Sequence, residues 1–456
     1  MPLQKNQILT LRIERLSSDG SGVAHSADGE AVFVPGTAPG DEARVRIVKD
    51  CGRYAFGILD ELLTPSPDRI PVDCPVAGPC GGCSLRHLDY AAELRAKQES
   101  VLDAFRRIGG LEVPVLDILP SPDADRYRNK VQFPVGIDKN GVPCIGFYAG
   151  RTHRIVPCPD CRLQPGVLNE IGNALCAFFA EKGIQPYSEE TGRGLVRHIF
   201  LRRGAHSGQI MVCLVCTRAK LPSAEELCTR LKAQFAEITT ILLNVNAKNT
   251  NVILGTETHT LYGPGYIEDT LCGVPVQLGP LSFYQVNTLA AEQLYGIAAQ
   301  YAQLTPDDLL LDLYCGMGTI GLSMAAHCRE LIGVEIVPEA IESAKANAAR
   351  MGADVAAKSR FFCADAGQAA TRLAAEGLHP DIVMLDPPRK GCDEATLSAV
   401  VRMSPRRVVY VSCNPATAAR DAAWLEQNGY HAEKVQPVDL FPRTRHCECV
   451  LSLSKV

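Results

Sequence analysis

The amino-acid sequence predicts a multidomain chain with a small β-barrel first, an α+β domain in the centre, and an α/β domain with a parallel, doubly wound sheet last. Three observations predict this order: short alternating strands near the N-terminus, a cysteine-rich loop after them, and strands alternating with alanine-rich helices beyond Gln277. A length of 456 residues gives room for roughly three domains. We expect these domains to span residues 1–65, 66–275 and 276–456.

The first unit alternates short apolar segments with glycine and aspartate turns. Strands are expected around Gly22–Ala24, Ala31–Val34 and Ala43–Ile47, and short strands at this spacing are typical of a small barrel. Pro65–Pro67 interrupts the pattern and closes the unit.

A helix over residues 89–109 is expected to connect the barrel to the central unit. Asp89 is a suitable N-cap, and Gly109–Gly110 a suitable end. The apolar face of this helix is expected to consist of Leu94, Val101, Phe105 and Ile108. Further on, apolar segments such as Leu195–Leu201 and Ile210–Val215 predict strands that mix with one or two helices.

Composition excludes several classes of protein. No apolar run approaches the roughly 20 residues of a membrane span, and the N-terminus lacks a signal-like segment. We therefore expect a cytoplasmic protein, without a membrane partner and monomeric. In a reducing compartment its 19 cysteines indicate buried thiols, metal ligands or a reactive thiolate rather than disulfides.

A glycine-rich turn follows the first strand of the last unit, Leu309–Leu313. Glycines such as Gly316 let the backbone approach a ligand closely, and Glu335, about twenty residues on, can accept both hydroxyls of a ribose. Residues Gly316–Gly321 also spell the dinucleotide fingerprint, so NAD remains open on this evidence alone.

Acidic residues at the ends of the next two strands favour a different cofactor. Phe361–Ala364 ends in Asp365, which suits an adenine amino group, and Asp381–Leu385 ends in Asp386. A single aspartate at such a position more often caps a helix. Acids on three consecutive strand ends make that interpretation weaker and predict S-adenosylmethionine.

Cys413 is the candidate nucleophile. It follows the strand Arg407–Val411, and Pro415 two residues later fixes a tight turn. A cysteine is more often a small buried hydrophobic residue, but its place at a strand end favours a reactive role. Glu448 lies two residues after His446, on the same face of an extended segment, and is the candidate base. The alternative is that Glu448 pairs with an arginine on the surface.

These segments resemble bacterial RNA (uracil-5-)-methyltransferases, of the kind that modifies 23S ribosomal RNA, over nearly the whole chain. The matching segments are Phe283–Asn287, Asp312–Gly318, Asp386–Arg389, Ser412–Pro415 and Phe441–Glu448. The resemblance implies an N-terminal TRAM domain with an OB-like barrel. It also implies a C-terminal, Rossmann-like class I methyltransferase domain.

The resemblance also assigns residues, with Cys413 as nucleophile and Glu448 as base. The cofactor positions that it implies are Gln285, Tyr314, Thr319, Glu335, Asp365 and Asp386. Tyr314 and Thr319 stand where relatives carry Phe and Asn, so the backbone carries the expected contact there.

The chemistry of uracil suits this pair. Carbon 5 is too weak a nucleophile to take a methyl group directly, and addition of the Cys413 thiolate to carbon 6 activates it. Glu448 then suits removal of the proton on carbon 5. The target uridine is expected to be flipped out or unpaired. A 5-methylcytosine enzyme would carry Pro-Cys where this chain reads Pro387–Arg389, so uracil is favoured.

Two interpretations remain for the cysteines of the central unit. By spacing alone, Cys80 and Cys83 with Cys158 and Cys161 match a four-thiolate zinc ribbon. The resemblance implies instead a [4Fe-4S] cluster held by Cys74, Cys80, Cys83 and Cys161. Zinc is kept as the alternative. The spacing between the first two of these cysteines does not match a radical S-adenosylmethionine enzyme.

A cationic stretch predicts contact with RNA. No acidic residue lies between Thr191 and His206, which favours a basic strand face for phosphates. Its cations are Arg193, Arg197, His198, Arg202, Arg203 and His206. Tyr127–Lys130 adds cations and an aromatic ring, although a solvated charged strand is the commoner meaning of such runs.

The expected partner is RNA, specifically 23S ribosomal RNA. The alternatives are a transfer-RNA (uracil-5-)-methyltransferase, a non-catalytic assembly factor that binds ribosomal RNA, and an iron-sulfur redox sensor.

Overall fold

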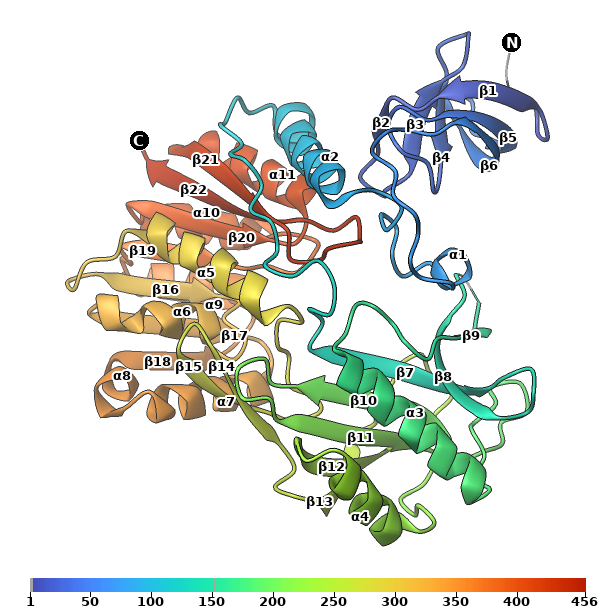
Figure 1. The fold of residues 1–456 in the computed structure, drawn as a ribbon. Coiled ribbons are helices and arrows are strands. Elements are labelled where there is room, and N and C mark those ends of the chain that lie inside the picture. The colour runs from blue at the N-terminus through green and yellow to red at the C-terminus, as the bar shows by residue number, and fades with distance from the viewer. Residues whose placement is uncertain (1–2, 151) are drawn as a thin grey trace.

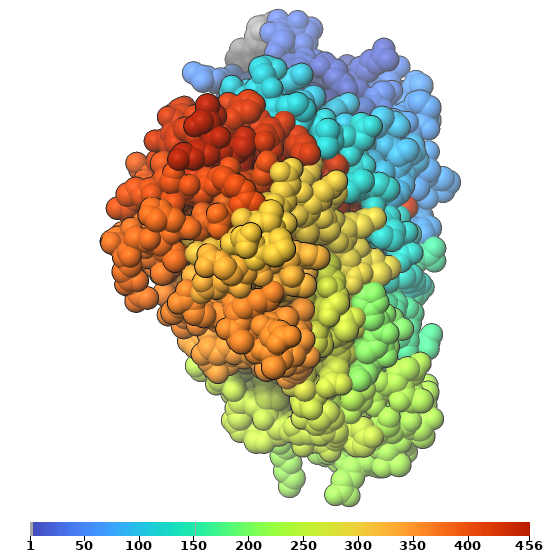
Figure 2. Space-filling view, turned by 90° about the vertical axis from the view of Figure 1, so that its left-hand side faces the viewer, coloured from blue at the N-terminus to red at the C-terminus, as the bar shows by residue number. Residues whose placement is uncertain are grey.

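The computed structural model describes residues 3–150 and 152–456. In Figure 1 the barrel (blue) lies beside the C-terminal sheet (orange and red), and the central unit (green) lies below both. The space-filling view in Figure 2 shows the same order, with the blue unit at the top and the green unit at the bottom. Among the described residues, none of the helices combines the length and apolarity that a membrane span requires.

The N-terminal unit is a six-stranded sheet with the order β1-β5-β6-β4-β3-β2. Its strands are β1 (Ile8–Arg12), β2 (Arg15–Leu16), β3 (Gly22–His25), β4 (Ala31–Val34), β5 (Glu42–Asp50) and β6 (Tyr54–Thr64). Alternate residues of β5, namely Ala43, Val45 and Ile47, are fully buried. The alternating pattern of the sequence therefore supplies the barrel core, as expected for a strand with one buried face.

The connecting segment contains α1 (Ala77–Cys80), α2 (Tyr90–Asp103) and a π-helical turn, η1 (Ala104–Gly109). The predicted cap is confirmed, because the Asp89 carboxylate accepts a hydrogen bond of 3.0 Å from the Ala92 N–H. Gly110 ends the helix in a left-handed conformation, with φ 64°.

The predicted buried face of α2 is only half right. Val101 and Phe105 are buried, but Ile108 is 57% exposed. The charged residues Glu93 and Lys97 take the buried positions instead, at 0% and 2% exposure. Periodicity could not predict this burial, because it depends on partners from a distant part of the chain.

The central unit is a seven-stranded sheet with the order β13-β12-β11-β10-β7-β8-β9. Its strands are β7 (Lys130–Ile137), β8 (Pro143–Tyr148), β9 (Ile155–Pro157), β10 (Val196–Arg203), β11 (Ile210–Cys216), β12 (Ile238–Val245) and β13 (Glu257–Tyr262). Its helices are α3 (Gly166–Glu181) and α4 (Ala224–Gln234). Within the described chain, β11 and β12 pair in parallel and the other neighbours pair antiparallel.

The predicted basic strand face for RNA on β10 is contradicted for three of its six cations, whereas Arg193 and His206 are exposed and Arg203 is half-buried. Arg197, His198 and Arg202 are 5%, 6% and 1% exposed. Arg202 donates to the Gly279 and Ser282 carbonyls at 2.8 and 2.7 Å. Arg197 likewise donates to the Asn246 and Lys248 carbonyls, at 3.1 and 2.6 Å. The buried arginines therefore stabilise backbone oxygens inside the protein and are not available to phosphates.

The ring of Tyr127 is buried as well, and its hydroxyl donates to the Pro442 carbonyl at 3.0 Å. It does not form the exposed stacking surface that its cationic neighbours suggested.

The C-terminal unit is a seven-stranded sheet with the order β18-β17-β16-β19-β20-β22-β21, parallel from β18 to β20 and antiparallel at β22 and β21. Its strands are β16 (Leu309–Leu313), β17 (Glu330–Glu335), β18 (Ser359–Cys363), β19 (Ile382–Leu385), β20 (Arg407–Ser412), β21 (Tyr430–Val438) and β22 (Glu448–Lys455). The predicted parallel, doubly wound sheet is therefore present.

Helices cover both faces of this sheet (Figure 1). They are α5 (Thr288–Ala302), α6 (Thr319–Met324), η2 (Ala325–His327), α7 (Pro338–Arg350), α8 (Ala353–Lys358), α9 (Ala366–Ala375), α10 (Glu394–Met403) and α11 (Pro415–Glu426). Leu310 packs into one buried cluster, and Leu309 and Leu311 pack into the other. A separate hairpin, β14 (Ile267–Leu271) and β15 (Val274–Leu278), lies between this unit and the central one.

Candidate active site at the edge of the parallel sheet

Parallel strands bring the candidate residues together. Because β16 to β20 run in the same direction, their carboxyl ends meet at one edge of the sheet. Glu335 ends β17, and Asp386 directly follows β19. Cys413 directly follows β20. The strand order therefore gathers residues that lie far apart in the sequence.

The glycine-rich turn after β16 is held by Glu335. Gly316 and Gly318 have φ of 55° and 80°, a left-handed conformation in which glycine is favoured. The Glu335 carboxylate accepts hydrogen bonds from the backbone N–H of Gly316 at 3.1 Å and of Ile336 at 2.8 Å. The predicted ribose-binding acid thus lies directly against the turn that is expected to approach the cofactor.

Two of the predicted cofactor residues have other partners. Asp365 caps α9, accepting a hydrogen bond of 3.1 Å from the Gln368 N–H. The hydroxyl of Tyr314 lies 3.4 Å from that of Thr396 on α10. Tyr314 itself has φ 66°, so its backbone belongs to the turn while its ring packs away from it.

Gln285 and Thr319 meet at a buried tyrosine. The Gln285 amide nitrogen lies 3.4 Å from the hydroxyl of Tyr295 on α5, and Thr319 also bonds this hydroxyl. Burial raises the pKa of Tyr295, and the nearby charge of Asp386 raises it further. The sequence analysis did not find Tyr295, because one tyrosine in an alanine-rich helix looks like an ordinary core residue.

Cys413, Glu448 and Asp386 form an electrostatically coupled group. Burial raises the pKa of Cys413 to about 11, and the charges of Glu448 and Asp386 add to it. Burial raises the pKa of Glu448 to about 8, with Asp386 adding to it. Burial also raises the pKa of Asp386 to about 7. Each effect has the sign expected for groups that lose water or face like charge.

Arg389 opposes these shifts. Its guanidinium lowers the pKa of both Cys413 and Glu448, because a cation favours the thiolate and the carboxylate. Arg389 follows Asp386 and two prolines after β19 and is exposed. The site therefore combines a thiol, a buried carboxyl and a cation, which is the set that nucleophilic and proton-transfer chemistry requires.

The cysteines of the central unit also approach one another. Burial raises the pKa of Cys83 to about 11, and Cys161 and Cys80 add to it. Burial raises the pKa of Cys80, with Cys161 and Cys74 adding to it. Cys161 thus lies near cysteines from which it is separated by about eighty residues. Among the described residues, however, no group of three or more side chains is arranged to hold a metal ion.

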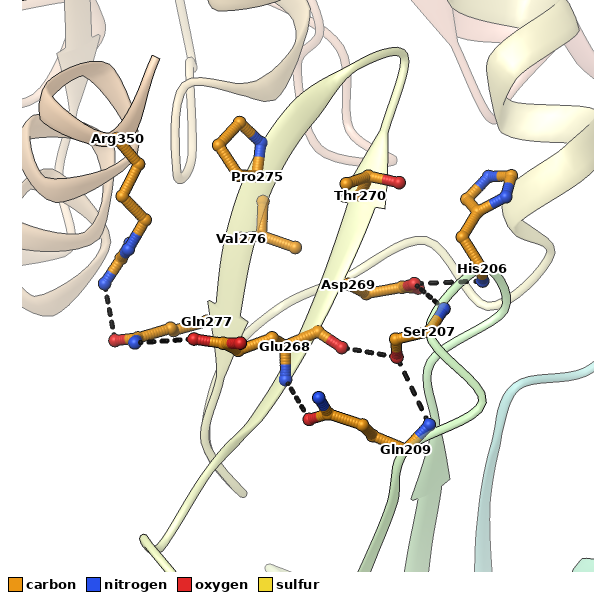
Figure 3. Close-up of a pocket in the computed structure, with 10 residues that line it drawn as sticks. All are labelled: His206, Ser207, Gln209, Glu268, Asp269, Thr270, Pro275, Val276, Gln277 and Arg350. Atoms are coloured by element: carbon orange, nitrogen blue, oxygen red, sulfur yellow. Dashed lines mark hydrogen bonds between the residues drawn. The ribbon is translucent and has the colours of Figure 1, made fainter. Parts of the chain in front are cut away.

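The pocket shown in Figure 3 is not this site. It has a volume of about 550 Å³ and is lined by residues of β14, β15, the turn after β10 and the end of α7. None of the predicted site residues lines it. Its Arg350 is at the far end of α7, roughly 18 Å from Pro338 for a helix of this length. Gln277 accepts from Arg350 and donates to Glu268, so the pocket wall is internally paired.

A Rossmann-like sheet with acids at its strand ends, joined to a small barrel, defines a class I methyltransferase with an accessory domain. The model of the tRNA (Uracil-5-)-methyltransferase family matches residues 89–456, and the TRAM domain model matches residues 2–59. The chain belongs to this family of S-adenosylmethionine-dependent RNA (uracil-5-)-methyltransferases. The predicted family, fold class and enzyme class are thereby confirmed.

Similar proteins cover the whole chain. It is 42% identical to the uncharacterized RNA methyltransferase BH0687 of Halalkalibacterium halodurans, over 99% of this chain and 98% of the relative. It is also 42% identical to an uncharacterized RNA methyltransferase of Listeria monocytogenes, over the same shares. Among solved structures it is similar to the Pyrococcus abyssi tRNA (uracil-54, C5)-methyltransferase in complex with S-adenosyl-L-homocysteine. That likeness has a TM-score of 0.77 and 28% identity, covering 98% of this chain and 100% of the other.

Proposed function

We propose that this protein methylates carbon 5 of a specific uridine in 23S ribosomal RNA through a covalent adduct with Cys413. The observation that carries the proposal is at the sheet edge, where the pairing of Ser412 with Cys449 brings Cys413 beside Glu448, and the charge of Glu448 raises the pKa of the Cys413 thiol.

The donor site is proposed at the glycine turn. Gly316 gives close approach of the backbone, and Glu335 is placed to accept ribose hydroxyls. Gln285, Thr319, Asp365 and Asp386 complete the proposed donor site, with Tyr314 contributing its backbone. S-adenosylmethionine, when bound, supplies the methyl group from its sulfonium.

The first step belongs to Cys413. Its thiolate adds to carbon 6 of uracil, forming the sulfur–carbon bond, and the electrons of the 5,6 double bond move into an enolate that ends on oxygen 4. Arg389 favours the thiolate that this step requires. Carbon 5 of the enolate would then form its bond to the methyl group as the sulfur–methyl bond of the sulfonium breaks and S-adenosylhomocysteine leaves.

The second step belongs to Glu448. Its carboxylate removes the proton from carbon 5, the bonding electrons restore the 5,6 double bond, and the carbon–sulfur bond breaks to return the Cys413 thiolate. A pKa of about 8 suits a general base near neutral pH, because an appreciable fraction is ionised and the proton affinity is high.

Contact with RNA is proposed for an aromatic group on the barrel that the sequence analysis did not single out. Phe33, Tyr54 and Phe56 have ring centroids 5.6 to 5.9 Å apart. Tyr54 and Phe56 are 41% and 37% exposed, and exposed rings on OB-like barrels stack on unpaired bases. Alanine at both positions should weaken RNA binding, measured by filter retention, while leaving single-turnover methyl transfer at saturating RNA unchanged.

A [4Fe-4S] cluster is proposed at Cys74, Cys80, Cys83 and Cys161, with zinc as the alternative. The four thiols supply suitable donor chemistry, and their mutual proximity raises the pKa of several of them. Among the described residues these side chains are not arranged as a three-ligand group. We therefore assign the cluster a structural role and no catalytic step. Iron, sulfide and zinc content of protein purified without air tests it.

Transfer RNA is the second candidate substrate, favoured by the whole-chain likeness to the Pyrococcus abyssi enzyme. The deciding experiment incubates the purified protein with S-adenosylmethionine and unmodified 23S ribosomal RNA or transfer RNA, and maps 5-methyluridine by mass spectrometry. Cys413→Ala is compared with Cys144→Ala, a half-buried cysteine on β8 outside the site.

The expected result is 5-methyluridine in 23S ribosomal RNA with the wild type and Cys144→Ala, and none with Cys413→Ala. If 5-methyluridine formed in transfer RNA alone, transfer RNA would be the substrate in place of 23S ribosomal RNA. If no variant methylates either RNA while all bind ribosomal RNA, the protein is an assembly factor and the enzymatic proposal is wrong.

A further inference from the structure

Two charged residues of α2 are buried against the catalytic unit. The Lys97 ammonium donates to the Glu93 carboxylate and to the Asp439 carboxylate, each at 2.7 Å. Lys97 is 2% exposed, and both acids are 0% exposed. Burial opposes the charge of Lys97, but its pKa is raised because Asp439 and Glu93 outweigh that effect. A cation with two carboxylates is therefore enclosed between the linker and the catalytic sheet.

Arg443 is the second cation of this group. Its backbone N–H donates to Glu93 at 2.7 Å, and its guanidinium lies 3.7 Å from the other Glu93 oxygen. Arg443 has φ 68°, a left-handed conformation that is costly for a residue with a side chain. The Glu93 carboxylate, by accepting the Arg443 N–H, holds this conformation, and the Tyr90 hydroxyl donates to Asp439 at 2.9 Å.

This ionic group fixes the turn that leads to Glu448. Residues 439–447 join β21 to β22, and Glu448 is the first residue of β22. In Figure 1 the turn, drawn in red, projects from the catalytic sheet beneath α2. Lys97 also donates to the Phe441 carbonyl at 3.2 Å. Three points of the turn are therefore tied to one helix, through Asp439, Phe441 and Arg443.

Stability alone does not account for this arrangement. Well-packed apolar residues would fill such a site at least as favourably, because two carboxylates and two cations each lose water on burial. Hydrogen bonds have a fixed length and direction, so they define the position of the turn, which apolar packing does not. The position of the turn matters because Glu448, whose carboxyl is the proposed base, is the residue that directly follows it.

We propose that Lys97 is a positioning residue for Glu448: by holding Asp439, Phe441 and Glu93 it fixes the 439–447 turn so that β22 presents the carboxylate to carbon 5. The inference rests on the proposed function, because it concerns the step in which Glu448 removes the proton and Cys413 leaves. The linker helix thereby acts on the second half of the reaction and not on the first.

The two halves of the reaction can be measured separately. Single-turnover mixing with S-adenosylmethionine labelled in the methyl group gives the rate of methyl transfer. Denaturing electrophoresis gives the fraction of protein bound covalently to RNA. Lys97→Met keeps the length of the side chain, and Asp439→Asn keeps its shape. Lys345→Met, which removes an exposed ion pair with Glu342, is the matched control.

For Lys97→Met and Asp439→Asn we expect methyl transfer within about threefold of wild type, release slowed on the order of tenfold or more, and a labelled covalent adduct that accumulates. Lys97→Arg, which keeps the cation, should restore part of the release rate. Lys345→Met should match wild type. A loss of folding would lower both steps together and give no adduct.

Equal slowing of both steps without adduct, in folded Lys97→Met and Asp439→Asn, overturns the proposal. If Lys97→Met does not fold, the double variant Glu93→Gln with Lys97→Met, which buries no net charge at these positions, gives the same readout. The variant Glu448→Gln distinguishes a failure of the proposed function, in which Glu448 is the base, from a failure of the positioning role proposed for Lys97. If it forms no adduct, Glu448 is not the base and the proposed function fails first. If it forms adduct while the Lys97 and Asp439 variants do not, only the positioning role is wrong.

Discussion

The two seven-stranded sheets of this protein bury opposite charges. At the edge of the catalytic sheet, burial raises the pKa of Asp312 to about 8, of Asp386 to about 7 and of Glu448 to about 8. In the central sheet, burial lowers the pKa of Lys130 to about 8 and of Arg202 to about 10. One sheet holds acids that bind protons more tightly than usual, and the other holds bases that bind them less tightly.

The topology of the two sheets accounts for the different roles of their buried charged groups. In the catalytic sheet five parallel strands deliver their carboxyl ends to one edge, so polar groups converge around a ligand site. In the central sheet mostly antiparallel neighbours send strand ends in both directions, and its buried arginines Arg197 and Arg202 each bind two backbone carbonyls instead. The comparison teaches that buried charge marks chemistry where strand ends converge, and structural support where they do not.

Glu448→Gln tests the chemical side of this comparison and should have the largest effect. The amide keeps the shape of the side chain but cannot remove a proton, so turnover should fall on the order of a thousandfold. Methylated RNA should remain attached to Cys413. Multiple-turnover kinetics and denaturing electrophoresis measure the two effects. Turnover near wild type would show that another group removes the proton.

Arg202→Met tests the structural side and should have a smaller effect. The side chain holds the carbonyls of Gly279 and Ser282, which precede Gln285 in the same loop. A hydrogen bond to a charged group contributes roughly 1.5–3 kcal/mol, partly offset here by relief of a buried charge. We expect KM for S-adenosylmethionine to rise on the order of tenfold.

The salt dependence of RNA binding should not change in Arg202→Met, because a buried cation releases no counterion from RNA. Arg230→Met, which removes exposed ion pairs with Glu181 and Glu226, serves as the control. A smaller salt slope in Arg202→Met alone would show that β10 contacts phosphates after all.

Arg389→Met should have the smallest effect of the three variants. It should change the pH dependence of the methyltransferase activity. In the proposed mechanism Glu448 acts in its ionised form, so activity should rise with pH through a pKa of about 8. Arg389 lowers the pKa of Glu448 and of Cys413, so its removal raises both and moves the rising limb to higher pH. We expect a displacement of about half a unit to one unit in the pH–rate profile. Lys390→Met is the control, and a displacement towards lower pH would contradict the assignment.

The sequence by itself determined the catalytic sheet and its active edge. The strand expected at Leu309–Leu313 is present with the same bounds, and Glu335, Asp386 and Cys413 lie at strand ends. This was possible because strand and helix periods are local, and because a parallel sheet places strand ends together whatever the details of packing.

Only the tertiary structure decided which charges are buried. Lys97 meets Asp439 across 342 positions of the chain, and Arg202 meets Ser282 across 80. Local patterns treat such residues as solvated because an unpaired buried charge is too costly. Burial becomes tolerable only when folding brings a distant partner within hydrogen-bond distance, and that partner is not encoded in the neighbouring residues.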